Sequence, residues 1–181
     1  MMKQSVRIIG GKLRGRKIHF PDIPGLRPTA DRVRETLFNW LMHDIRDACV
    51  LDAFAGSGAL GFEAASRGAA NVIMVESSPE AAQSLRKQAD ILALENVNIV
   101  CQDVLHYLQQ TTIAFDIVFL DPPFASELLL PSLDLIDQRG LLSQQGLVYV
   151  ETNANSPFDA PFMQVMKEKK AGQVRYRLLK R

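Results

Sequence analysis

Short apolar runs alternate with helical patterns from residue 49 onward, and this alternation constrains the fold more than any other feature of the sequence. It is typical of strand–helix–strand units assembled into a mostly parallel sheet, so an α/β class is expected. Ser77 and Glu80 have capping-box spacing at the start of one of the helices. The predicted strands are residues 50–54, 71–76, 97–101, 115–120 and 147–152, the predicted helices are residues 59–67, 77–94 and 127–138, and a closing hairpin is expected at 163–168 and 174–179.

Length and composition fit one globular domain. The chain has 181 residues, of which 47% are hydrophobic and 23% charged, so it can bury a full core. We expect a single domain over residues 1–181, with a basic extension and a helix in residues 1–47 and an α/β core in residues 48–181. No apolar run is long enough to span a membrane and no signal-peptide core follows the first residues, so a cytoplasmic protein is expected. Cys49 and Cys101 lack metal-ligand spacing and are interpreted as buried thiols, and no metal site is predicted.

Basic residues are concentrated at the two ends of the chain. Residues 1–34 contain nine Lys or Arg and two acids, residues 167–181 contain seven and one, and the body between them contains five and 17. Two basic ends on an acidic body favour a polyanionic partner, RNA or DNA, over two merely solvated faces. In the first end, two strand-like runs between Val6 and Phe20 flank glycines, and an amphipathic helix starting at Thr29 carries Trp40 on its apolar face, where core packing is expected.

A glycine-rich turn follows the first predicted strand of the core. Gly56-Ser57-Gly58-Ala59-Leu60-Gly61 matches G-x-G-x-x-G, and Glu76 ends the next strand, where a carboxylate can bind ribose hydroxyls. NAD and S-adenosylmethionine share these needs. Asp52 favours S-adenosylmethionine, because it would meet the cationic amino-acid end of that ligand. Asp103 can accept a hydrogen bond from an adenine amino group, although it is equally suited to cap a helix.

The element Asp121-Pro122-Pro123-Phe124 directly follows the strongly apolar fourth strand. It is therefore expected at the carboxyl edge of the sheet, where open α/β folds bind ligands. The prolines fix the backbone and remove N–H donors, so the Asp121 carboxylate and the Pro122 carbonyl can hold both hydrogens of a planar NH2 group. Phe124 would stack on the target ring. This arrangement predicts methyl transfer to a planar nitrogen, with Asp121 or water as proton acceptor.

With these residues in place, the chain closely resembles the RsmD family of bacterial small-subunit ribosomal RNA guanine-N2 methyltransferases. The match is long, and the combination of its motifs is specific. It rests on Arg7-Ile8-Ile9-Gly10-Gly11 with Arg14-Gly15, on Arg27-Pro28-Thr29 with Asp31-Arg32-Val33-Arg34-Glu35, on Leu51-Asp52-Ala53-Phe54-Ala55-Gly56-Ser57-Gly58, and on Asp121-Pro122-Pro123-Phe124.

The resemblance implies a Rossmann-like class I methyltransferase fold, with a seven-stranded, mostly parallel sheet and an antiparallel C-terminal hairpin. It also implies S-adenosyl-L-methionine as donor and a flipped guanine, at position 966 of 16S rRNA within a small-subunit ribonucleoprotein particle, as substrate. The expected catalytic residues are Asp121, Pro122, Pro123 and Phe124. The expected cofactor-binding residues are Asp52, Phe54, Ala55, Gly56, Ser57, Gly58, Glu76 and Asp103. The hypothetical RNA contacts are Arg7, Lys12, Arg14, Arg16, Arg27, Arg32 and Arg34.

Three other functions use parts of the same pattern. A DNA adenine-N6 or protein glutamine-N5 methyltransferase would use the same Asp-Pro-Pro-aromatic element, although the basic ends argue against a protein substrate. An NAD-dependent oxidoreductase would explain the glycine turn and Glu76 but not residues 121–124. A non-catalytic RNA-binding protein would explain only the charge distribution.

Overall fold

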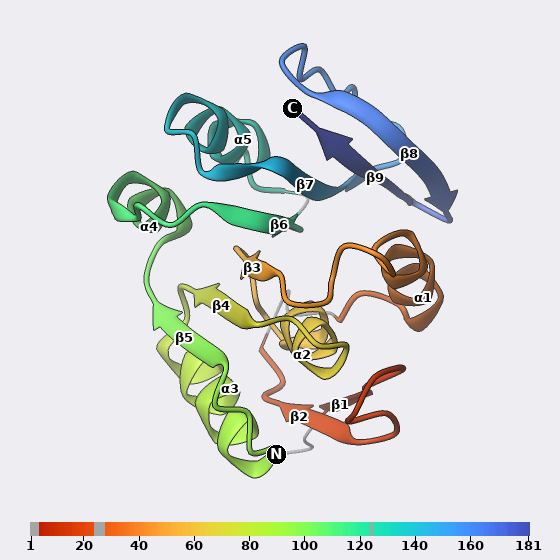
Figure 1. Cartoon of the computed structure of the whole chain (residues 1–181). Helices are drawn as coiled ribbons and strands as arrows, with labels where there is room; N and C mark the ends of the chain where they lie inside the picture. The colour runs from red at the N-terminus through yellow and green to blue at the C-terminus, as the bar shows by residue number, and fades with distance from the viewer. Residues whose placement is uncertain (1–3, 24–27, 124) are drawn as a thin grey trace.

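A seven-stranded sheet forms the centre of the molecule in the computed structural model, which describes residues 4–23, 28–123 and 125–181 (Figure 1). Its strand order is β5-β4-β3-β6-β7-β9-β8, with β3 to β7 parallel and the β8–β9 hairpin antiparallel. The predicted mostly parallel sheet with a closing hairpin is confirmed. The strands are β3 (Cys49–Asp52), β4 (Asn71–Glu76), β5 (Val97–Cys101), β6 (Phe115–Leu120), β7 (Leu142–Asn153), β8 (Gln164–Ala171) and β9 (Val174–Lys180).

The chain order places a topological switch point between β3 and β6. From β3 the chain adds β4 and β5 on one side, and it then returns to add β6 and β7 on the other side. Asp52 of β3 pairs with Phe119 of β6 across this point. Connections leave in opposite directions here, which opens a crevice outside the carboxyl ends of the strands. The glycine turn and the Asp-Pro-Pro element therefore face one crevice.

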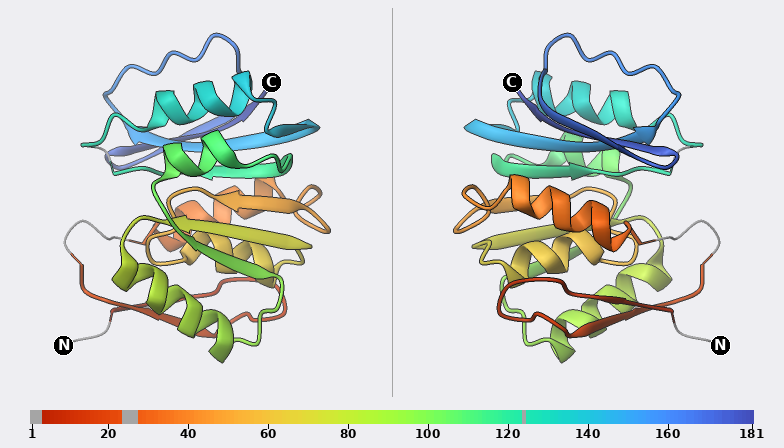
Figure 2. Two further views of the ribbon diagram at one scale, coloured as in Figure 1. Left: turned by 90° about the vertical axis from the view of Figure 1, so that its left-hand side faces the viewer. Right: turned by 90° about the vertical axis from the view of Figure 1, so that its right-hand side faces the viewer.

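Helices cover both faces of the sheet, as the side views show (Figure 2). Apolar residues of α1, α2 and α3 join one buried cluster, and those of α4 and α5 join a second cluster on the opposite face. The central strands are buried on both faces and therefore read as continuous apolar runs, such as residues 72–75. The helices are α1 (Asp31–Trp40), α2 (Ala59–Ser66), α3 (Pro79–Ile91), α4 (Val104–Gln110) and α5 (Leu129–Gln138).

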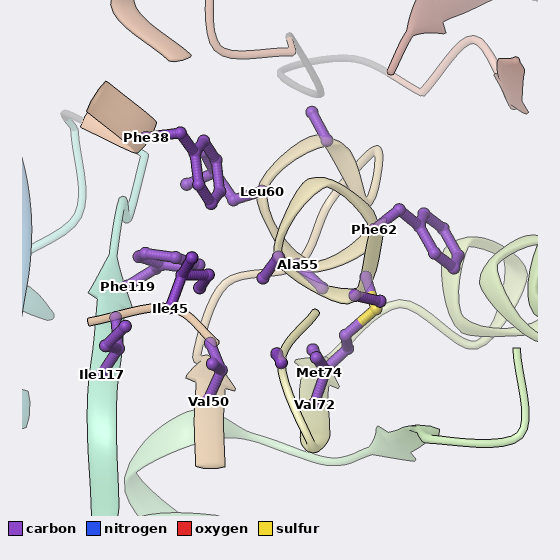
Figure 3. Close-up of a cluster of buried hydrophobic side chains, with 14 of the residues drawn as sticks. Phe38, Ile45, Val50, Ala55, Leu60, Phe62, Val72, Met74, Ile117 and Phe119 are labelled. Atoms are coloured by element: carbon purple, nitrogen blue, oxygen red, sulfur yellow. The ribbon is translucent and has the colours of Figure 1, made fainter. Parts of the chain in front are cut away.

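The first cluster ties α1 and α2 to the sheet (Figure 3). Phe38 of α1 contacts Phe119 of β6 edge to face, with ring centroids 5.9 Å apart. A side chain at Gly61 of α2 would meet the Met74 sulfur of β4 at 2.8 Å. The third glycine of the turn is thus required for close packing of helix against strand, which fixes the start of α2 at the crevice.

The N-terminal extension packs on the core through a glycine loop. Strands β1 (Gln4–Arg7) and β2 (Lys17–Phe20) form an antiparallel hairpin, which confirms the predicted ribbon. In the loop between them, the N–H groups of Ile9 and Gly10 donate to the buried Glu63 carboxylate, each at 2.8 Å. A Cβ at Gly11 would lie 1.9 Å from the Ser66 carbonyl oxygen, and Gly11 has φ 76°. The glycine pair therefore allows the loop to dock on α2.

Two helix starts differ from the sequence prediction. Helix α1 begins at Asp31 and not at Thr29, whose hydroxyl instead donates to Asp121. Helix α3 is capped by Ser78, whose hydroxyl oxygen accepts from the Ala81 N–H at 3.3 Å, so the predicted capping box starting at Ser77 is wrong. Proline at the first helical position is compatible with this cap.

The structure also tests smaller expectations from the sequence. Trp40 is partly buried and packs against Tyr176 of β9, with ring centroids 5.4 Å apart, as expected for core packing. Cys49 is half-buried, but Cys101 is exposed at the end of the edge strand β5, which corrects the expectation of two buried thiols. The sequence prediction missed the short helix α4. In the described parts of the chain, no helix is long and apolar enough to cross a membrane.

Candidate active site

A cavity of about 710 Å³ lies at the carboxyl ends of the parallel strands. The turns after β3, β4, β5 and β6 line it, together with the segment before α1 and the turn between β8 and β9. The structure therefore brings together almost every predicted cofactor and catalytic residue that it describes. The predicted residues in the lining are Asp52, Phe54, Ala55, Gly56, Ser57, Glu76, Asp103, Asp121, Pro122 and Pro123.

Asp52 ends β3 at the base of this cavity and is 2% exposed. Its carboxylate accepts a hydrogen bond from the Gly61 N–H at 2.9 Å, which holds the first turn of α2. Burial raises the pKa of Asp52 to about 7, with smaller contributions from the charges of Asp121 and Glu76. A cationic ligand would stabilise the ionised form of this buried carboxyl group, because the positive charge offsets the cost of burying the negative one.

Glu76, the second acid predicted to bind the cofactor, holds the glycine turn in place. The Glu76 carboxylate accepts from the N–H groups of Gly56 and Ser78, both at 2.8 Å. Gly56 and Gly58 have φ of 51° and 81°, in the left-handed region that favours glycine. Gly58 itself is not part of the cavity wall: it precedes α2, with its α-carbon against the Phe62 ring. Each Glu76 oxygen can still accept a further hydrogen bond from a ribose hydroxyl.

Asp103 has one of the two roles between which the sequence could not choose, and its position is compatible with the other. Its Oδ1 accepts from the His106 N–H at 3.0 Å, so it caps α4. It also lines the cavity beside Gln102, at the end of β5. The capping role is confirmed, and contact with an adenine amino group stays a prediction that the cap does not obstruct, because the carboxylate has spare acceptor sites.

Asp121 and Pro122 face Asp52 across the switch point. Asp121 accepts a hydrogen bond from the Thr29 hydroxyl at 3.2 Å, and burial raises its pKa to about 6. The Pro123 carbonyl oxygen accepts two hydrogen bonds within the loop, one from the Ser126 N–H at 2.8 Å and one from the Ser126 hydroxyl at 2.7 Å. A planar amine would therefore use the Pro122 carbonyl. The predicted stacking residue, Phe124, lies outside the described residues.

Sequence reasoning missed two polar groups beside Asp121. Glu151 of β7 is 5% exposed and lines the cavity, and Thr29 lies in the segment before α1. Burial and the charge of Asp121 raise the pKa of Glu151 to about 8. The signal was available for Glu151, because it is an acid that follows the apolar run 147–150. Thr29 gave no signal, because its contact spans 92 residues of sequence.

The structure separates the predicted RNA contacts into groups. Arg7, Lys12, Arg14, Arg16 and Arg32 are exposed, and Arg27 lies outside the described residues. Arg7 pairs across the hairpin with Lys17, a residue that the sequence prediction omitted. These two cations line a second cavity of about 310 Å³, which shares residues 28–30 with the first.

Lys12 and Arg14 occupy a different place. They belong to the loop that bonds to Ser66, at the far end of α2 from the main cavity. Helix α2 has eight residues, so this loop is about 12 Å from the glycine turn at 1.5 Å per residue. Arg7, beside the cavity that adjoins the main one, is thus better placed near the site than Lys12 and Arg14.

Arg34 is a correction to the predicted RNA set. It has no solvent exposure and donates to the Arg7 carbonyl at 2.9 Å and to the Glu63 carboxylate at 3.4 Å. It cannot reach a phosphate from this position. Arg34 instead links the hairpin to α1 and α2, and its charge is balanced by Glu63 and by Asp31 at 2.6 Å.

The acids of the main cavity suit a cationic ligand and would repel a pyrophosphate, which disfavours NAD. Asp52, Glu76 and the glycine turn all line this cavity, and their binding of an amino-acid end and a ribose stays a prediction. The sheet order and the close relatives of the chain together define an S-adenosylmethionine-dependent methyltransferase. A provisionally assigned S-adenosylmethionine-dependent methyltransferase of Streptococcus mutans has the same fold, with a TM-score of 0.70 at 17% identity over 98% of this chain and 55% of that chain.

Closer matches specify the family. The family model described as "Conserved hypothetical protein 95" matches residues 6–180. The chain is 47% identical over 178 residues to "Ribosomal RNA small subunit methyltransferase D" of Escherichia coli strain K12, covering 97% of this chain and 90% of that protein. The relative of the same name in Haemophilus influenzae is 44% identical over 181 residues, covering 97% and 94%. The solved Escherichia coli protein yhhF, a provisionally assigned methyltransferase, superposes with a TM-score of 0.89 at 46% identity, covering 98% of each chain. The chain belongs to the RsmD family.

Proposed function

We propose that the chain methylates the exocyclic N2 amine of a guanine in small-subunit ribosomal RNA, guanine 966 of the 16S molecule by resemblance. The observation that carries this proposal is that Asp121 and Pro122 share one cavity with the glycine turn. The names of the Escherichia coli and Haemophilus influenzae relatives support the choice of ribosomal RNA. The substrate is a structured ribonucleoprotein particle of the small subunit.

The chain offers separate groups to each part of the methyl donor. Asp52 accepts from the cationic amino group, Glu76 from the ribose hydroxyls, and Asp103 from the adenine amine. The turn of residues 54–58 brings backbone close to the ligand, since glycines leave the approach open. When bound, S-adenosylmethionine supplies an electrophilic methyl group on a sulfonium.

Asp121 and Pro122 position the target amine. The lone pair of an exocyclic NH2 is delocalised into its ring, so the nitrogen reacts well only when it is held in line with the methyl carbon. The Asp121 carboxylate accepts one N–H and the Pro122 carbonyl accepts the other, which orients the nitrogen and stabilises the positive charge that develops on it. Asp121 then receives the proton that the amine releases.

The target base has to leave its stacked position to reach this cavity. A stacked guanine cannot present its N2 edge to groups at the sheet edge, so the nucleotide turns outward and its base enters the cavity. Phe124 is proposed to stack on the flipped ring, and the residue before it, Pro123, is exposed at the cavity wall. Stacking on an aromatic ring contributes about 1–3 kcal/mol per base.

The cations around the second cavity are proposed to hold the RNA backbone. Arg7 and Lys17 lie side by side there, and the shared wall of residues 28–30 connects them to the catalytic cavity. A phosphate next to the flipped nucleotide can thus pair with a cation while the base is in the main cavity. The basic strand β8, with exposed Lys167, Lys169 and Lys170, ends at the turn that lines the other side of the cavity.

Labelled methyl transfer tests the proposal. The acceptors are small ribosomal subunits, naked ribosomal RNA and DNA from a strain that lacks this gene, and the modified nucleoside is then mapped. We expect N2-methylguanine in 16S rRNA from the subunits. Methyladenine in DNA as the main product, or methylation of a protein glutamine, would replace this proposal by the alternative that shares its chemistry.

A variant at Asp121 tests the role of the catalytic element. Asp121→Ala is expected to lower the rate of methyl transfer by about 100-fold or more, because it removes an acceptor that acts on the developing charge. Binding of S-adenosylmethionine, measured by calorimetry, should persist. An unchanged rate would show that Asp121 has no part in the transfer. A non-catalytic RNA-binding protein predicts instead that Asp121→Ala leaves the cellular phenotype unchanged.

A further inference from the structure

A second carboxyl group lies next to Asp121, and the proposed transfer does not use it. Leu120 of β6 pairs with Val150 of β7, so Asp121 and Glu151 follow at the same level at the carboxyl ends of neighbouring parallel strands. Both line the catalytic cavity. Glu151 is 5% exposed and accepts a hydrogen bond from the Tyr149 hydroxyl at 2.6 Å. A buried acid this close to a catalytic acid is expected to influence its charge.

The hydroxyl of Thr29 connects the two acids. It donates to Asp121 Oδ2 at 3.2 Å, and it also interacts with the Glu151 carboxyl group, where it favours the ionised form. A hydroxyl has a single hydrogen to donate, so it can serve only one of the two carboxylates at a time. If both acids were ionised, one would lack this donor while the two charges repelled each other. A proton on one acid removes both problems.

The surroundings determine which acid keeps the proton. Burial raises the pKa of Asp121 to about 6, whereas burial and the Asp121 charge raise the pKa of Glu151 to about 8. The Tyr149 hydroxyl opposes the shift of Glu151 but does not cancel it. Asp52 of β3 adds negative charge on the other side of Asp121, and Tyr176 of β9 faces Tyr149. We therefore expect the pair to carry one proton between about pH 6 and pH 8, mainly on Glu151.

We propose that Glu151 is a positioning residue that shares one proton with Asp121 across Thr29, and that by holding this proton it leaves Asp121 ionised for the incoming amine. The inference rests on the proposed function, in which Asp121 receives the amine hydrogen. As the bond from nitrogen to the methyl carbon forms, the bond from that carbon to sulfur breaks and its electron pair stays on sulfur. The amine then loses a proton to Asp121. Glu151 keeps its own proton, so the pair is neutral until Asp121 releases its proton to solvent.

Titration of the carboxyl groups tests the pair without any substrate. The side-chain carboxyl carbons of the full chain are labelled with 13C and followed by NMR against pH in wild type, Glu151→Gln and Asp121→Asn. In wild type we expect two steps, near pH 6 and pH 8, from these two acids. Glu151→Gln should lose the upper step and keep the lower one. Asp121→Asn should move the remaining step of Glu151 downward by at least half a pH unit, because the neighbouring charge is gone. A Glu151 step that stays in place in Asp121→Asn would overturn the proposal.

Tyr149→Phe gives the same test with the glutamate intact. It removes the hydroxyl that lowers the pKa of Glu151, so the upper step should move to higher pH while the lower step stays. This variant keeps the buried aromatic ring. It therefore provides the test even if Glu151→Gln does not fold. An upper step that does not move in Tyr149→Phe would show that the step belongs to another group and would refute the assignment to Glu151.

Kinetics connect the pair to the reaction. The pH profile of kcat for methyl transfer is expected to rise with a midpoint near pH 6 in both wild type and Glu151→Gln, whereas a second inflection near pH 8 should be present in wild type only. Profiles that superimpose would refute a role for Glu151 in the reaction. Absence of methyl transfer to ribosomal RNA by the wild type would refute the proposed function instead, and the NMR titration would still decide the carboxyl pair.

Discussion

Arg34→Ala is expected to lower stability and to leave the RNA contacts unchanged. The guanidinium is fully buried and donates to the Arg7 carbonyl at 2.9 Å, the Thr29 carbonyl at 3.2 Å and the Glu63 carboxylate at 3.4 Å. Removing one partner of a buried ion pair costs about 3–5 kcal/mol, because the other charge stays buried. Glu63 keeps Arg67 at 2.7 Å and two backbone N–H donors, so we expect a value near the low end, about 3 kcal/mol.

Urea unfolding and thermal melting measure this loss. For a chain of this length, about 3 kcal/mol corresponds to a fall of about 6–12 °C in Tm. Arg32→Ala is the matched control, since Arg32 is exposed on the same helix and its removal should change the free energy of unfolding by less than about 0.5 kcal/mol. The reasoning is refuted if Arg34→Ala unfolds like wild type and instead binds RNA with a reduced salt dependence, as a lost phosphate contact would.

Three further results are expected. The affinity for S-adenosylmethionine should fall about tenfold from pH 8 to pH 6, because the cationic ligand binds the ionised form of Asp52 and the pKa of Asp52 is about 7. Calorimetry of Asp52→Asn should show a smaller pH dependence of this affinity. Gly58→Ala should lower the free energy of unfolding more than Gly15→Ala. Both glycines have positive φ, but of these two positions only 58 would bring the new Cβ against an aromatic carbon, at 2.5 Å. Equal losses of stability in the two variants would contradict this. In a salt series of RNA binding, Arg7→Ala should reduce the slope of log affinity against log salt by about one. Arg14→Ala, in the loop at the far end of α2, should change the slope less. The reverse order would indicate that RNA contacts this far loop instead of the hairpin strands.

The bounds of several strands were predictable because burial on both faces of the sheet produces continuous apolar runs. Residues 71–76, 97–101 and 115–120 form strands at the predicted bounds, since each is an apolar run between turn signals. Helix α4 was missed because its seven residues span too few turns for a clear period. Strand β7 begins five residues earlier than predicted, at Leu142, where a register shift interrupts its pairing with β6.

Charged residues were harder to interpret than apolar ones. Arg34 and Arg32 are equivalent in a count of charges, yet one is buried and the other exposed. The difference comes from Glu63, an acid at the core of α2 whose role depends on a chain segment 53 residues away. Long-range pairing of this kind has no local pattern, so the sequence could not separate a structural arginine from an RNA contact.

The charges around the site also explain how one chain can bind two oppositely charged molecules. Five acids line the main cavity and would repel a phosphate there, whereas Arg7 and Lys17 line the adjoining one. Under the proposed function, a nucleic acid satisfies both cavities only if its backbone stays beside the cations while one uncharged base turns into the acidic cavity. The same acids attract the cationic methyl donor. After transfer the sulfur is neutral, so the attraction for the spent donor is weaker, and this difference favours exchange for the next donor molecule.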